Sequence, residues 1–129
     1  MRLLLDTHAL LWWLAEPEKL SKPAIRAIRN GENTAYVSAA SIWEIAIKNA
    51  SGKLDGAVLL DNLDGIFRDQ GFQELPITAY WATRAAALPG SHRDPFDRML
   101  AAQAQFSDPP LVLISRDKVF ERLGARRLW

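Results

Sequence analysis

Four carboxylates share one position in the predicted secondary structure. Each lies at the carboxyl end of a predicted strand or in the first turns of the helix that follows; they are Asp6, Glu44, Asp97 and Asp117. Open α/β sheets bind ligands in the crevice beyond the carboxyl ends of their strands, so all four are expected in one crevice. Carboxylates that converge repel one another, and some must take up protons unless a cation neutralises them. A hard divalent cation with oxygen ligands, Mg²⁺ or Mn²⁺, resolves this repulsion most simply.

An acidic metal centre of this kind can hydrolyse a phosphodiester. The metal polarises a phosphoryl oxygen and lowers the pKa of a bound water, and a second ion can help to clamp the attacking and leaving oxygens. The sequence shows no Ser-His-Asp order and no glycine-rich phosphate loop of the Walker type. Metal-assisted hydrolysis is therefore the chemistry that the acids predict.

A structural alternative stays open for each acid. Asp6 can help to start the helix after the first strand, and Glu44 can pair with a lysine four residues later. Asp97 can complete a capping box that begins at Asp94, and Asp117 can stabilise a helix N-terminus through the macrodipole. Each of these roles is plausible singly; the four positions taken together favour a functional site.

Basic and histidine side chains surround the predicted crevice. The cations that could hold phosphates are Arg93, Arg98, Arg116, Lys118 and Lys48. Ordinary solvated charges that offset the acids are an equal alternative for each of them. His8 and His92 are expected to donate hydrogen bonds beside the acids or to be solvated, and neither is assigned as a metal ligand.

The elements that position these residues follow from apolar patterning and cap residues. Leu3 to Leu5 is an unalternated apolar run, typical of a strand covered on both faces, and Thr7 can cap the helix that begins at once. Further caps are predicted at Ser21, Ser38, Thr78 and Asp94, each of which precedes a helical pattern. The other predicted strands are 34–38, 72–75, 111–115 and a last one ending at residue 129, and the predicted helices are 9–15, 23–29, 38–49, 58–70, 78–87, 95–106 and 117–123.

Strands thus alternate with helices or helix pairs. This pattern predicts parallel strands joined by right-handed crossovers. The expected fold class is α/β, a three-layer α/β/α sandwich with a central, mostly parallel sheet of about five strands.

Composition bounds the class of protein. The chain has 129 residues, 49% hydrophobic and 24% charged, with a net charge of +1 and no cysteine. This excludes disulfides and thiolate metal sites, and any nucleic-acid partner must be held by a local patch. No apolar run approaches the ~20 residues that span a membrane, and the first strand begins without a signal peptide. We therefore expect a cytoplasmic protein that binds no membrane.

The first helix is apolar nearly all round. Trp12 and Trp13 are adjacent and therefore point about 100° apart, so one of them is expected to be poorly covered by the core. The alternative is that both are buried, one against the sheet and one against the helix over residues 23–29. An uncovered tryptophan would indicate a surface for a protein partner.

Four segments together resemble the PIN-domain ribonucleases, and closely the VapC-type toxins of toxin–antitoxin pairs. They occur in the family's order and cover essentially the whole chain. The segments are Leu3-Leu4-Leu5-Asp6-Thr7-His8-Ala9-Leu10-Leu11-Trp12, Val37-Ser38-Ala39-Ala40-Ser41-Ile42-Trp43-Glu44-Ile45, His92-Arg93-Asp94-Pro95-Phe96-Asp97-Arg98-Met99-Leu100-Ala101-Ala102-Gln103-Ala104 and Leu111-Val112-Leu113-Ile114-Ser115-Arg116-Asp117.

The resemblance implies a single PIN-like nuclease domain over residues 1–129 and a Mg²⁺- or Mn²⁺-dependent endoribonuclease, a hydrolase that acts as a toxin. It implies that the four acids are the family's catalytic and metal-binding quartet. Asp94 is then an extra acid, either a cap or an accessory ligand. Ser115 stands where the family often has threonine, and it is expected to orient ligands from behind, as is Thr7.

The resemblance also implies partners. An antitoxin is expected to wrap the first helix at Leu11, Trp12 and Trp13, since hydrophobic grooves of this kind anchor helix-in-groove contacts. It is also expected to reach the acidic site with a basic side chain. The family commonly forms homodimers, which offers a second use for the same surface. RNA is the implied substrate.

Other functions stay open from the residues alone. A phosphatase with an aspartyl nucleophile would carry a second acid where this chain has His8. A phosphoacceptor signalling domain would not use Glu44. A non-catalytic partner-binding α/β domain with vestigial acids is the third alternative, and metal-dependent RNA cleavage would distinguish the nuclease from all of these.

Overall fold

The computed structural model describes all 129 residues and contains one five-stranded sheet. All strand pairs are parallel, in the order β3-β2-β1-β4-β5. The strands are β1 (Arg2–Leu5), β2 (Thr34–Ser38), β3 (Gln73–Leu75), β4 (Val112–Ile114) and β5 (Arg127–Leu128). The predicted α/β class and parallel sheet are confirmed, and β1 lies at the centre of the sheet.

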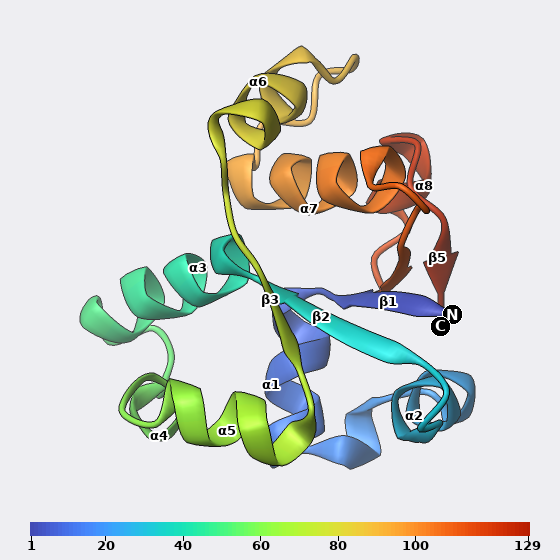
Figure 1. Ribbon diagram of the computed structural model, residues 1–129. Helices are drawn as coiled ribbons and strands as arrows, with labels where there is room; N and C mark the ends of the chain where they lie inside the picture. The colour runs from blue at the N-terminus through green and yellow to red at the C-terminus, as the bar shows by residue number, and fades with distance from the viewer.

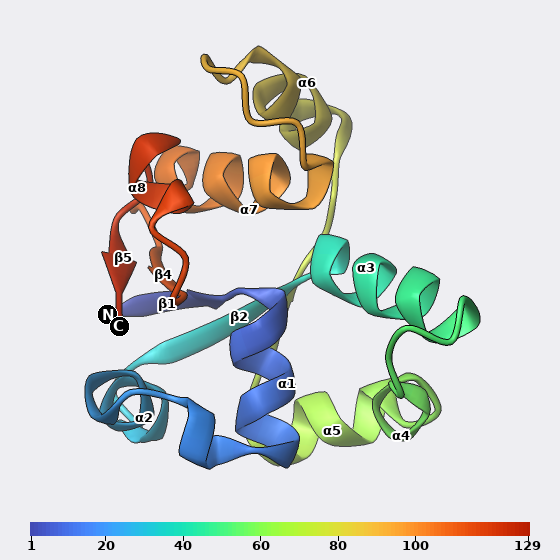
Figure 2. The same ribbon diagram turned by 180° about the vertical axis from the view of Figure 1, so that it is seen from behind.

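Helices cover both faces of this sheet (Figures 1 and 2). They are α1 (Thr7–Ala15), the 3₁₀ turn η1 (Pro17–Lys19), α2 (Lys22–Arg29), α3 (Ala39–Ala50), α4 (Ala57–Leu60), α5 (Leu63–Gln70), α6 (Ala79–Ala87), α7 (Pro95–Phe106) and α8 (Val119–Arg122). Figure 1 shows α1, α2, α4 and α5 on one side and α6, α7 and α8 on the other. No helix combines the length and the apolar character that crossing a membrane requires.

Strand β1 explains why the two faces form two cores. Its residues alternate: Leu3 and Leu5 pack into one hydrophobic cluster with α1 and α2, and Leu4 packs into the other with α7. All three leucines are fully buried. The unalternated apolar run is therefore what a strand covered on both faces requires.

Most predicted helix starts are confirmed. The side chains of Ser21, Ser38, Thr78 and Asp94 each accept a hydrogen bond from a backbone N–H in the first turn of the following helix. The predicted cap at Thr7 is wrong. Asp6 caps α1 instead, and Thr7 is the first residue of that helix.

The single helix predicted over residues 58–70 is also wrong, because the chain breaks it into α4 and α5. Asn62 has a non-helical backbone, with φ −141° and ψ 43°. Its side chain fills the space beside Gly65, where a Cβ would meet Asn62 Oδ1 at 2.4 Å. Asn favours such turns because its side chain competes for backbone groups. Gly71 ends α5 with φ +70°, the left-handed conformation that glycine favours just after a helix C-terminus.

Candidate active site

Asp6 stands at the carboxyl end of the central strand. Its backbone N–H donates to the Ile114 carbonyl at 3.1 Å, and its Oδ1 accepts from the Ala9 N–H at 2.7 Å. The residue is only 7% exposed. Asp6 therefore starts a helix, which was its structural alternative, and at the same time presents a buried carboxylate at the sheet edge where ligands bind.

Burial raises the pKa of Asp6 above its ordinary value. Hydrogen bonds from the Ser115 side chain and the Ala9 amide act in the opposite direction, as does the charge of His8. The negative charge of Asp117 raises the pKa further. No cationic side chain forms an ion pair with Asp6. The site therefore holds an ionised Asp6 at a cost, which a bound cation would remove.

Asp117 faces Asp6 from the end of β4. Its backbone N–H donates to Ser115 Oγ at 3.0 Å, and its Oδ1 accepts from the Val119 N–H at 2.9 Å. Ser115 is fully buried, so it connects the two acids from behind. Asp6 and Asp117 line the same cavity of about 370 Å³.

Glu44 projects from α3 and is held by two different elements. Thr7 Oγ1 donates to Glu44 Oε1 at 2.6 Å, and Lys48 Nζ lies 2.7 Å from Glu44 Oε2. Ser41 Oγ is 3.1 Å from the same threonine hydroxyl. The i,i+4 ion pair that was the structural alternative for Glu44 is present. Thr7 therefore orients the glutamate from behind, which is the accessory role expected for it.

Asp97 lies in the first turn of α7, and its Oδ2 contacts His92 Nε2 at 2.9 Å. Only half of the predicted capping box is present: the N–H groups of Phe96 and Asp97 donate to Asp94 Oδ1, but the Asp97 carboxylate bonds to His92 and not to the Asp94 N–H. Burial raises the pKa of Asp97; the hydrogen bond with His92 lowers it, and the charges of Asp94 and Glu44 raise it. Asp94 is exposed and acts as a helix cap.

Charges of neighbouring acids raise the pKa values of both Asp6 and Asp97. The charge of Asp117 acts on Asp6, and the charge of Glu44 acts on Asp97. No three carboxylates or histidines converge closely enough to form a metal cluster as they stand. One site built from all four acids therefore stays a prediction. Their donor atoms, all carboxylate oxygens, fit Mg²⁺ or Mn²⁺.

Four of the five predicted phosphate-binding cations divide into three groups. Arg116 and Lys118 line the cavity that contains Asp6 and Asp117, and Arg93 lines a separate cavity of about 490 Å³ beside His92. Lys48 is engaged with the glutamate of the site. None of Arg93, Arg116 and Lys118 has a carboxylate within ion-pair distance.

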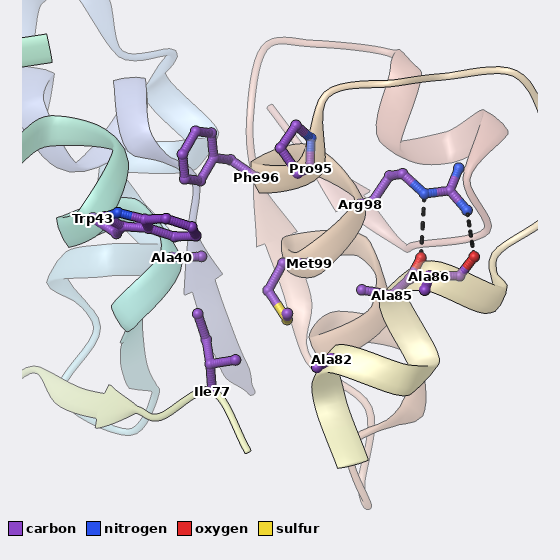
Figure 3. Close-up of a pocket in the computed structure, with 10 residues that line it drawn as sticks. All are labelled: Ala40, Trp43, Ile77, Ala82, Ala85, Ala86, Pro95, Phe96, Arg98 and Met99. Atoms are coloured by element: carbon purple, nitrogen blue, oxygen red, sulfur yellow. Dashed lines mark hydrogen bonds between the residues drawn. The ribbon is translucent and has the colours of Figure 1, made fainter. Parts of the chain in front are cut away.

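Backbone carbonyls already hold the Arg98 guanidinium, which argues against its assignment as a phosphate ligand. Its guanidinium donates to the backbone carbonyls of Ala85, Ala86, Leu88 and His92, and Figure 3 shows two of these bonds. These carbonyls lie at the C-terminal end of α6 and in the loop after it, where the helix leaves its acceptors unpaired. Arg98 therefore joins α6 to α7.

The two tryptophans of α1 are both half-buried, so neither expectation for them is met in full. Trp12 contacts the C-terminal Trp129, with ring centroids 5.9 Å apart, and lines the same cavity as Asp6. Trp13 donates from Nε1 to Gln70 Oε1 at 2.9 Å. Leu11 is also half-buried. The face of α1 is therefore partly open along its length.

Sequence reasoning missed an apolar groove beside the acids. Trp43 precedes Glu44 on α3 and is 58% exposed, and it meets Phe96 edge to face at 5.3 Å between centroids. The groove, about 250 Å³, runs between α3, α6 and α7 (Figure 3). The sequence signal was the tryptophan itself, whose exposure depends on helices that are distant in the chain.

The chain is similar to known proteins over most of its length. Its sequence matches the PIN domain family from residue 3 to residue 126. It is 36% identical over 103 residues to Ribonuclease VapC22 of Mycobacterium tuberculosis (strain ATCC 25618 / H37Rv), and the aligned residues cover 78% of this chain and 77% of that protein.

Two solved structures share the fold. VapBC2 from Rickettsia felis, bound to a promoter DNA fragment, aligns with a TM-score of 0.68 at 14% identity over 99% of this chain and 98% of that one. FitAB bound to an IR36 DNA fragment aligns with a TM-score of 0.63 at 20% identity, over 99% and 94%. The sequence match and the VapC relative together show that the chain belongs to the PIN domain family and is of the VapC type.

Proposed function

We propose that this protein is a Mg²⁺- or Mn²⁺-dependent endoribonuclease that acts as the toxin of a toxin–antitoxin pair in the cytoplasm. The observation that carries the proposal is the buried, unpaired Asp6 at the end of the central strand, facing Asp117 across a cavity rimmed by Arg116 and Lys118. A relative named as a ribonuclease supports RNA as the substrate.

Asp6 and Asp97 would be the central metal ligands, with Glu44 and Asp117 completing the set. When bound, the metal supplies a polarised phosphoryl oxygen and a water of lowered pKa. Around it, Thr7 orients Glu44 through its 2.6 Å hydrogen bond. The Ser115 hydroxyl donates to the Asp6 carboxylate and accepts from the Asp117 N–H, so it connects these two aspartates. These bonds keep the carboxylates oriented before the metal arrives.

The half-open face of α1 is the surface that we propose for a cognate antitoxin. Leu11, Trp12 and Trp13 present apolar area there, and Trp12 borders the cavity of Asp6. A bound segment on this face would cover the mouth of the acidic site. The two neighbouring structures are of VapBC2 and FitAB, which supports a second component for this chain as well.

A second copy of the chain fits a different surface. The large apolar side chains that are most exposed near the site are Trp43 and Ile47 on α3 and Tyr80 on α6, between 46% and 58% exposed. Trp43 lines the apolar groove of Figure 3, and Ile47 and Tyr80 lie on the two helices, α3 and α6, that contribute residues to it. Exposed apolar area of this kind marks a protein interface, and two-fold dimers are the commonest oligomers. We therefore propose homodimerisation through α3 and α6.

Purified protein incubated with total cellular RNA tests the nuclease. We expect endonucleolytic products with Mg²⁺ or Mn²⁺ and none with EDTA, and no products from Asp97→Asn. Asp69→Asn, the same change on the exposed side of α5, is the matched control and should cut normally. Cleavage that survives EDTA would contradict the metal, and cleavage by Asp97→Asn at the normal rate would contradict the site.

A further inference from the structure

We propose that the cavity beside Asp6 receives one unpaired nucleotide of the RNA, with its base stacked against Trp12, next to the phosphodiester that is cut. The inference rests on the proposed ribonuclease function and assigns Trp12 as the residue that positions one base of the RNA beside the cut. The cavity is lined by Asp6, His8, Trp12, Arg116, Asp117 and Lys118.

The cavity combines the groups that bind a nucleotide. Its volume of about 370 Å³ lies near the lower end of the ~300–1,000 Å³ typical of small-ligand sites. Trp12 is its one apolar wall, and Arg116 and Lys118 are cations without a carboxylate partner. An aromatic ring and free cations around one hollow match a base and its phosphate.

The stacking surface is already assembled. The Arg116 guanidinium carbon lies 5.1 Å from the centroid of the Trp12 ring, within cation–π distance. The His8 ring lies 5.5 Å from the same ring, and Trp129 supports it at 5.9 Å. A base can therefore add to an existing stack of arginine and tryptophan, with little ordering left to be done on binding.

The other hollows near the acids do not offer this combination. The groove at Trp43 is lined almost entirely by apolar side chains, and its one cation, Arg98, is used by backbone carbonyls. The cavity at Arg93 contains cations but no aromatic ring other than that of His92. Neither of these two hollows brings a tryptophan, cations without a carboxylate partner and two of the acids together, as the cavity beside Asp6 does.

Base pairing and this stack exclude each other. A base inside a helix has its two faces covered by its neighbours, and it must leave the stack before it can lie on a protein ring. The cavity also adjoins Asp6 and Asp117, so a nucleotide held there places its phosphate next to the proposed metal ligands. The nucleotide that stacks on Trp12 is therefore unpaired, and its phosphate lies next to the acids.

A cycle of two changes tests the stack directly. Fluorescence anisotropy in EDTA measures the affinity for a short single-stranded RNA, and for the same RNA with an abasic residue placed at each position in turn. Trp12→Leu keeps an apolar side chain against Trp129 but removes the aromatic face. We expect one abasic position to weaken binding to the wild type roughly ten-fold or more. The same abasic position should have almost no effect on binding to Trp12→Leu.

Trp13→Leu is the matched control, because it makes the same change one residue later on a side chain that bonds to Gln70. It should bind RNA as the wild type does and should respond to the abasic residue in full. Arg116→Gln removes the other layer of the stack without touching the core, and it should also weaken the response to the abasic residue. This variant decides the matter if Trp12→Leu lowers the melting temperature by more than a few degrees.

Equal effects of the abasic residue on the wild type and on both cavity variants would overturn the inference. So would a loss of antitoxin binding in Trp12→Leu with RNA affinity unchanged, since the ring would then belong to the protein partner. Failure of the nuclease itself gives a different result: intact RNA in Mg²⁺ while the abasic response in EDTA persists. Binding and cleavage therefore report on the two proposals separately.

Discussion

Replacing Asp6 by asparagine or by alanine separates its two roles. The carboxylate caps α1 through a 2.7 Å bond from the Ala9 N–H, and it is a buried charge with no ion-pair partner. Asparagine retains an oxygen that can cap the helix and removes the charge. Alanine removes both, so the difference in stability between the two variants isolates the cap.

The cap sets the first magnitude. Losing an aspartate or asparagine cap typically costs about 1 kcal/mol. For a domain of 129 residues, that free energy corresponds to a melting temperature about 3–5 °C lower. We therefore expect Asp6→Ala to melt about 3–5 °C below Asp6→Asn, and both to lose RNA cleavage in Mg²⁺.

The charge sets the pH dependence. Burial raises the pKa of Asp6 in the folded protein above its ordinary value of 3.8. The folded state then holds the proton more tightly than the unfolded state, so this group contributes stability below pH 3.8 that is lost as the pH rises through the raised pKa. Asp6→Asn has no such loss. Its melting temperature should exceed that of the wild type by an amount that grows as the pH rises from acid to neutral.

Thermal unfolding followed by circular dichroism in EDTA, between pH 4 and 7.5, measures both effects. EDTA is needed because a bound cation would reverse the sign by stabilising the ionised carboxylate. An advantage of Asp6→Asn that shrinks as the pH rises would refute the assignment of Asp6 as a costly buried charge. Equal melting temperatures for the asparagine and alanine variants would refute its role as the cap.

Four further outcomes are expected from the same geometry. Mg²⁺ that binds only the folded state should stabilise the wild type by about 2.7 kcal/mol at a Mg²⁺ concentration a hundred times Kd, and thermal unfolding should show this as a higher melting temperature. The melting temperature of an Asp6→Asn, Asp97→Asn double variant should not change. Asp94→Ala should cost about 1 kcal/mol in chemical unfolding for the lost cap, and it should reduce the cleavage rate much less than Asp97→Asn. Arg98→Met should lower stability by about 2 kcal/mol, since a charged donor to four carbonyls is lost, with RNA affinity in a binding titration unchanged. Thr7→Val should cost about 1–3 kcal/mol and slow cleavage in single-turnover assays, because a buried carboxylate oxygen loses its 2.6 Å donor.

The sequence alone determined the elements and their class. Three leucines before Asp6 indicated a strand buried on both faces, and β1 is the central strand. Cap residues marked the starts of most helices because capping is a local interaction between a side chain and the next few amides. The prediction failed at residues 58–70, where the non-helical backbone of Asn62 interrupts an apolar pattern that continues past it.

The tertiary structure alone decided how the candidate site is arranged. The sequence could place four acids at one edge of the sheet, but it could not show that Asp6 and Asp117 line one cavity or that Thr7 and Lys48 hold Glu44. Nor could it show that Arg98 turns to the end of α6, while Arg116 lies over Trp12. The direction of a long side chain depends on which acceptor or ring a distant segment brings within reach. Strand order and helix packing set those neighbours, and no local pattern in the chain records them.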